Sequence, residues 1–230
     1  AVVVVLNLRG KKGENKTSAE GAASSSSAPS DGGQQSSVPS SNATGRGDHK
    51  CDVPVAPDKA FSAELPSDYQ FKKTYDGIKY PVSATYGPTY TPGVVGYCFA
   101  HNPAGAAMAA ITYMAAESDI NATEAERRGL LSKRVASEYK PEAPESHPAD
   151  SADARIAGYD IESYSPEKAT IGIVVIAKDS DGKNMGFKVS IPLIWEDNDW
   201  KIDTDKKPEP SPLTKEPTYI FKAQGGSQGS

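Results

Sequence analysis

Apolar and polar residues alternate along the C-terminal half of the chain, which is the pattern of β-strands with one buried face. The alternation is loose over residues 156–164, becomes a dense apolar run over 169–177, and is clean over 187–195. Asp181-Gly182 separates the last two segments and is a strong signal for a hairpin turn. A second turn at 196–199 precedes a return strand. The order predicts three or four antiparallel strands joined by hairpins.

Two helices are predicted before these strands. Asn102 and Pro103 mark a helix start, because Asn can cap the free amides and Pro is favoured at the first helical position. The alanine-rich stretch that follows, to about residue 117, is small on every side and predicts a helix buried close to a sheet. A second helix opens with the capping-box pair Thr123 and Glu126 and continues to Pro141.

The element order predicts an α+β fold, in which a curved antiparallel meander sheet carries two helices packed in its concave face. Residues 53–92 are rich in Pro and Tyr, and Pro is disfavoured in helix interiors and in central strands. We therefore expect this stretch to be extended chain over the core, with one short strand near residues 79–85.

The N-terminal residues 1–8 are almost entirely apolar, but a bilayer-spanning helix needs about 20 apolar residues. We interpret them as the end of a truncated transmembrane helix; a short β-prone leader, or a first strand of the fold, is the alternative. The basic residues that follow often flank a membrane span. On their own they favour a cytoplasmic location for the rest of the chain, and a more basic preceding flank would reverse that orientation.

Residues 9–50 are rich in Ser, Ala and Gly and contain few apolar side chains. Such a segment cannot offset its ordering entropy by burial, so it predicts a disordered linker. This segment explains why only 37% of the chain is hydrophobic, below the roughly 45–50% of compact domains. The predicted organisation is a linker, a domain over 51–223 and a flexible tail over 224–230.

Charge divides the chain in the same way. Residues 1–50 contain six basic and four acidic residues, whereas residues 51–230 contain 19 and 26, a net charge of −7. Nucleic-acid binding requires a basic face. The acidic domain therefore argues against a nucleic-acid partner.

A set of residues near the first predicted helix and the last turn forms a recognisable motif. Its members are Gly87, Pro88, Gly96, Tyr97, His101, Asn102, Pro103, Gly105, Ala106, Trp195 and Trp200. Over about residues 85–223 the chain resembles actinobacterial conjugative-element membrane proteins. It departs from their pattern around Cys98, where a shorter Gly-Tyr-Ala-His join is expected.

The resemblance implies an N-terminal membrane helix, a low-complexity linker and one extracytoplasmic domain. That domain is expected to resemble the cystatin-like cone of nuclear transport factor two and of VirB-eight-type subunits of type IV secretion channels. The implied role is a non-enzymatic, single-pass membrane-anchored assembly subunit of a conjugation or type IV secretion-like system. Its expected partners are the membrane, other secretion-channel subunits and further copies of itself. A surface lipoprotein-like accessory factor is one alternative.

A second alternative is a small-ligand-binding or enzymatic cone that uses His101 as a pocket acid or base. A histidine directly before a helix cap more often serves the turn, so we expect a structural role. Asp160 and Glu162 would share one strand face, where solvated charges are the usual explanation. His49 and His147 lack partners at metal-ligand spacing. We therefore assign no catalytic residue, cofactor or metal.

Cys51 and Cys98 are the two cysteines of the chain. If the domain is extracytoplasmic, a disulfide between them would tie its start to the approach to the first helix. Two unrelated buried thiols remain the alternative.

Overall fold

The computed structural model describes residues 49–52, 65–140, 154–179, 181–206 and 208–222. The predicted end of a membrane helix (1–8), nearly all of the predicted linker, His147 and the predicted tail (224–230) lie outside these residues. None of the helices in the described part of the chain is long and apolar enough to cross a bilayer.

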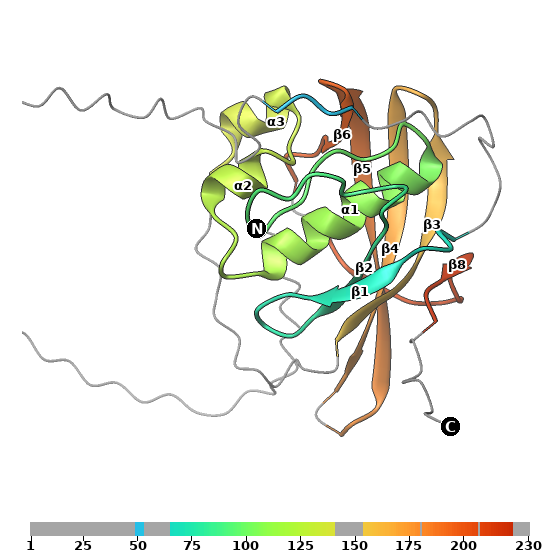
Figure 1. Cartoon of the computed structure of the whole chain (residues 1–230). Helices are drawn as coiled ribbons and strands as arrows, with labels where there is room; N and C mark the ends of the chain where they lie inside the picture. Colours follow the sequence, from blue (N-terminus) through green and yellow to red (C-terminus); the bar gives the residue numbers. More distant parts are fainter. Residues whose placement is uncertain (1–48, 53–64, 141–153, 180, 207, 223–230) are drawn as a thin grey trace, which may run out of the picture.

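Eight strands form a single curved sheet (Figure 1). They are β1 (Gln70–Lys73), β2 (Lys79–Val82), β3 (Arg155–Tyr164), β4 (Lys168–Lys178), β5 (Asn184–Glu196), β6 (Asp199–Ile202), β7 (Ser211–Pro212) and β8 (Tyr219–Ile220). The first six lie side by side in chain order, while β7 pairs with β5 and β8 with β3.

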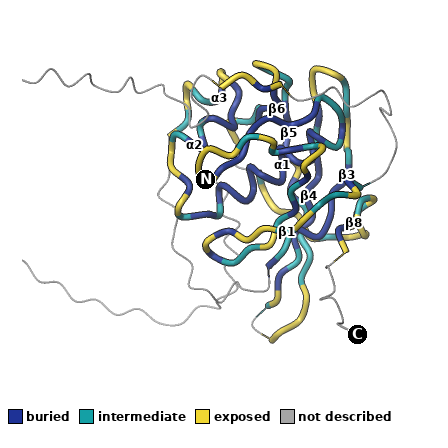
Figure 2. The backbone as a smooth tube through the Cα atoms, in the orientation of Figure 1, coloured by how far each residue is buried: buried dark blue, intermediate teal, exposed yellow. Residues whose placement is uncertain are grey.

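Helix α1 (Pro103–Ser118) lies across one face of the sheet and contacts β2 to β6. Every residue of α1 except Ala104 and Ser118 is buried, as Figure 2 shows by its dark tube. The small side chains on all sides of α1 explain this, because they let the helix backbone approach the sheet closely. The predicted buried helix is thus present, with its cap at Asn102, whose side chain accepts a hydrogen bond from the Gly105 N–H.

The sheet is covered on its other face as well. Ile173 and Val174 are neighbours on β4 and point to opposite faces, yet both are fully buried. The second cover is residues 211–221, here called the C-terminal strap, which pair first with β5 and then with β3 and so cross β4 between them. Burial on both faces explains the dense apolar run of β4, since only one-sided strands alternate.

The predicted α+β class, with a curved sheet and helices packed against it, is confirmed. The meander of β3 to β6 is antiparallel as predicted. The sheet also contains one parallel pair, β2 and β3, at Lys79 and Arg155. One detail of the prediction is wrong. The predicted second helix is two short helices, α2 (Glu124–Arg128) and α3 (Lys133–Glu138).

The break between α2 and α3 has a tertiary cause. The main chain of Leu130 accepts a hydrogen bond from Ile202 N–H at 2.9 Å, and Ser132 N–H donates to Ile202 oxygen at 2.9 Å. These residues therefore cover the free edge of β6 instead of continuing a helix. Ser132 then starts α3 by accepting a hydrogen bond from the Val135 N–H.

We expect the Gly105→Ala substitution to destabilise the domain by about 1–3 kcal/mol or more. A Cβ at this position would lie 1.9 Å from the main-chain oxygen of Ala100, and backbone cannot yield as a side chain can. Urea unfolding measures the change. Gly182→Ala is the control: no atom lies within 4 Å of its added Cβ, so it bears only the cost of its positive φ, about 1 kcal/mol. Equal losses for the two variants would contradict the steric argument.

Candidate functional site

The motif residues meet at one place in the fold. The loop before α1 (residues 97–102) packs against the turn between β5 and β6 (residues 195–201), and we call this contact the hairpin junction. It joins segments about 100 residues apart in sequence. The side chain of Trp200, with no exposed surface, donates from Nε1 to the Ala100 oxygen at 3.0 Å.

Asp199 is the polar centre of the hairpin junction. Its carboxylate is fully buried and accepts from the main-chain N–H groups of Phe99 at 2.9 Å, Cys98 at 3.2 Å and Trp200 at 3.1 Å. The ammonium of Lys201 lies 3.0 Å from Oδ2. Both carboxylate oxygens therefore face donors, which is the condition for keeping a buried charge.

Lys201 connects this centre to α2. Its side chain is only 5% exposed and also donates to the Gly129 oxygen at 2.7 Å. Close by, the hydroxyl of the buried Tyr97 donates to the Glu126 main-chain oxygen at 2.9 Å. The hairpin junction thus ties the start of α1, the end of α2 and the last hairpin into one unit.

Glu126 has two structural roles. One carboxylate oxygen closes the predicted capping box with Thr123, and the other accepts the N–H groups of Val94 and Val95. Burial alone would raise the pKa of Glu126, but these hydrogen bonds outweigh it and hold the pKa below its ordinary value. The capping-box pair was predictable from sequence. The hydrogen bonds from Val94 and Val95 to the Glu126 carboxylate were not.

His101 lies flat on Trp195, with ring centroids 3.8 Å apart and planes 6° from parallel. Its Nε2 lies within hydrogen-bonding distance of the Pro166 main-chain oxygen, at the turn between β3 and β4. Trp200 meets both rings edge-on. The ring therefore connects three segments of the fold.

Two motif glycines allow the loop to fold back toward α1. Gly87 has a φ of 106°, a backbone conformation that residues with a side chain rarely adopt. At Gly96 an added Cβ would lie 2.3 Å from the Pro88 ring. The segments around Tyr90 and Tyr97 pair through main-chain hydrogen bonds as a result.

Cys51 and Cys98 form a disulfide with Cα atoms 5.2 Å apart. Both residues are buried, at 7% and 1% exposed, and Cys98 belongs to the hairpin junction. The sulfurs and an Asp199 oxygen lie within 4.8 Å of one another, and they are the one such group of three in the described part of the chain. The disulfide occupies both sulfurs, so this group is not available to a metal ion while the bond is intact.

Comparison with known proteins gives one family and no relative of known function. The family described as a domain of unknown function (DUF8175) matches residues 17–219. The chain belongs to this family. No curated protein and no solved structure matches the chain.

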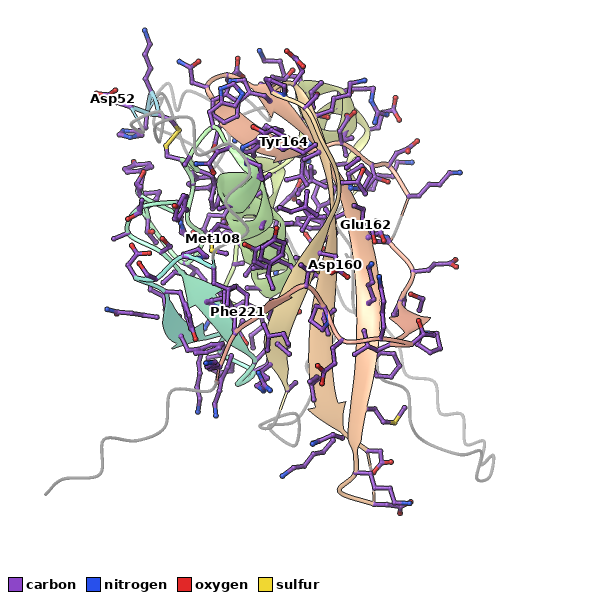
Figure 3. The ribbon with its side chains drawn as sticks, turned by 90° about the vertical axis from the view of Figure 1, so that its right-hand side faces the viewer. Asp52, Met108, Asp160, Glu162, Tyr164 and Phe221 are labelled. Carbon is purple, nitrogen blue, oxygen red and sulfur yellow. A yellow bond between two sulfur atoms is a disulfide. The ribbon has the colours of Figure 1, made fainter. Side chains whose placement is uncertain are left out.

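The DUF8175 match includes the hairpin junction and also a second charged cluster, on the outer face of the sheet. Lys188 on β5 lies 3.1 Å from Asp160 and 2.7 Å from Glu162, both on β3. Figure 3 shows Glu162 on the side of the sheet away from Met108 of α1. Asp160 also accepts the Thr218 N–H of the C-terminal strap at 2.7 Å.

The expectation that Asp160 and Glu162 share a face is consistent with their common partner Lys188, but Asp160 is not a solvated charge. It is 8% exposed, because the C-terminal strap covers it. Burial alone would raise the pKa of Asp160, but hydrogen bonds from Thr218 and Lys188 outweigh it and hold the pKa below its ordinary value. The carboxylate therefore holds the strap on the sheet.

Because the pKa of Asp160 is lowered by folding, its stabilising contribution is complete above about pH 5 and is lost as the pH falls through the folded value. We expect Asp160→Asn to lose less stability than the unmodified chain between about pH 6 and about pH 3. Urea unfolding at both pH values measures this. Asp181→Asn, at an exposed hairpin turn, is the control and should keep the full pH dependence. An unchanged pH dependence in Asp160→Asn would show that the strap contact does not titrate.

The sequence does not predict the buried roles of Asp199 and Lys201. They fall in the predicted turn and return strand, where charges are usually exposed. The sequence carried one signal: acidic and basic residues two apart in a strand share a face.

The remaining histidine of the described residues, His49, stacks on Tyr90 with ring centroids 3.7 Å apart.

Proposed function

We propose that this protein is a non-enzymatic, membrane-anchored assembly subunit of a conjugation or type IV secretion-like system, with its domain outside the cytoplasm. The motif resemblance suggests the system. The observation that carries the proposal is the disulfide between Cys51 and Cys98. Disulfides persist in oxidising compartments and are rare in the cytosol, so this bond supports an extracytoplasmic domain.

The position of the disulfide also fits a tethered domain. Cys51 stands where the predicted linker ends, and Cys98 stands in the hairpin junction. The bond therefore attaches the entering chain to the core of the fold. Any pull along the linker would be carried by a covalent bond instead of by the contacts of one terminal segment.

The chemistry of the motif supports a scaffold. His101 stacks on Trp195, Asp199 is enclosed by main-chain donors, and Trp200 is fully buried. These residues build the contact between α1 and the last hairpin. Such a domain would act by presenting its surface to other subunits and to copies of itself.

Deletion of the gene from its mobile element tests the role. We expect conjugative transfer to be lost and to return when the whole gene is supplied in trans. Supply of the domain alone, from residue 51 onward and exported without its tether, should not restore transfer. Unchanged transfer in the deletion strain would overturn the proposed role.

Cysteine alkylation in the native host tests the location separately. After denaturation, a maleimide polymer should leave the protein unmodified without reductant and add two polymers after reduction. Two reactive thiols without reductant would overturn the extracytoplasmic placement.

A further inference from the structure

A small pocket lies between the β1–β2 turn, the 94–95 loop and the second half of α1. Its lining includes Thr74, Tyr80, Val94, Thr112 and Asp119. The enclosed space is about that needed for one water molecule. A group of that size, rather than a whole small molecule, is what the pocket can take.

One wall of this pocket carries a polar group without a partner. Thr112 on α1 is 4% exposed, and its hydroxyl has no hydrogen-bond partner in the described part of the chain. Buried polar groups in native proteins are nearly always hydrogen-bonded, so such an exception indicates a missing ligand or water. The hydroxyl can accept two hydrogen bonds and donate one.

The second wall supplies a negative charge. Asp119 is 6% exposed and uses one oxygen for the Tyr75 N–H and the other for the Asn121 N–H, both at 3.0 Å. The nearby guanidinium of Arg127 donates to the Asp119 main-chain oxygen, not to its carboxylate. Each carboxylate oxygen therefore keeps capacity for a further donor.

Two exposed apolar residues lie at or beside the pocket. Val94 lines it and is 40% exposed, and Tyr75, whose main-chain N–H donates to Asp119, is 67% exposed. They are two of the three large apolar side chains that are exposed among the described residues. Exposed apolar surface beside a polar, acidic base suits a side chain with an apolar stem and a charged head.

We propose that this pocket binds the ammonium group of a lysine side chain on a partner protein. The ammonium is compact and carries three donors, which match the free acceptors on Thr112 and Asp119. Its four-carbon stem would lie against Val94 and Tyr75. The net charge of −7 over residues 51–230 favours approach of a basic partner surface. This proposal does not depend on the role in conjugation.

The test is a titration of the isotope-labelled chain, followed by amide NMR. The probe is Nα-acetyl-lysine N-methylamide at millimolar concentrations, since a single side chain gives weak binding. We expect saturable shifts at the amides of Val94, Val95 and Thr112. The matching norleucine compound and the Nε-acetylated compound, which lack the charge, should not produce them. Equal shifts with all three compounds, or no saturable shift, would overturn the proposal and leave a bound water as the explanation.

Variants of the two walls complete the test. Thr112→Val removes the unpartnered hydroxyl at nearly constant volume, so the chain should keep or gain stability while the lysine response is lost. Asp119→Asn should lose the response as well, and Asp181→Asn, which removes the same charge at a distant turn, should retain it. A stable Thr112→Val variant with an undiminished lysine response would overturn the assignment of this pocket.

Discussion

The Asp199→Asn substitution is expected to lower the free energy of unfolding by about 3–5 kcal/mol. Asp199 is fully buried, and both of its oxygens accept hydrogen bonds from donors. An amide would turn its NH₂ group toward one of these donors. It would also leave the ammonium of Lys201, only 4% exposed, without its charged partner. A buried charge that loses its counter-ion is strongly destabilising in a protein interior.

Asp197→Asn is the matched control, since it makes the same chemical change two residues away. Asp197 pairs with Lys133 at the surface, where the side chains are 45% and 70% exposed. We expect a loss of about 1 kcal/mol or less. Asn also tolerates the positive φ of 53° at this position. Urea unfolding of the two variants measures the difference, and similar losses would show that the hairpin junction does not depend on the Asp199 charge.

Removal of the disulfide is expected to cost up to about 4 kcal/mol, because the bond closes a loop of 47 residues in the unfolded chain. Cys51→Ala is the variant of choice. Cys98 has a φ of 68°, so a substitution there would combine the loss of the disulfide with a change in the energy of this left-handed backbone conformation. Urea unfolding with and without reductant measures the change.

Reductant supplies the internal control for this prediction. The unmodified chain should lose stability when reduced, and Cys51→Ala should be indifferent to reductant. If reduction left the unmodified chain as stable as before, the bond would contribute nothing to the folded state. Cys98 also donates its N–H to Asp199, so Cys51→Ala and Asp199→Asn share a contact network. Their effects should therefore not add.

The disulfide and the pocket have different consequences for the same domain. The disulfide stabilises the fold at the end where the chain enters. The unpartnered hydroxyl of Thr112 lowers the stability of the fold, as expected of a group that is retained for binding. The stability of Thr112→Val relative to the unmodified chain therefore reports directly on whether this position is under a binding constraint.

Local sequence signals determined most of the elements. Alternation set the long strands β3 and β5, and Asp181-Gly182 set the turn between β4 and β5. Asn102 capped α1 and Thr123 capped α2 as expected. These features depend on residues a few positions apart, so periodicity and capping rules suffice to predict them.

Other features depend on contacts between distant segments, and the sequence did not reveal them. The predicted second helix breaks because residues 130–132 cover the edge of β6. The strap closes the outer face of β4 because β7 and β8 find partners on β5 and β3. Local propensity gave no sign of either partner.

By itself, then, the sequence determined the α+β class, the order of helices and long strands, and the division into an acidic domain and a weakly basic N-terminal segment. The tertiary structure alone decided where the charges lie. Three residues of the same type have three different roles. Asp199 balances a buried lysine, Asp160 holds the strap on the sheet and Asp119 lines a pocket. The role of a carboxylate is set by the donors around it. For each of these three residues, at least one donor comes from a segment distant in the chain.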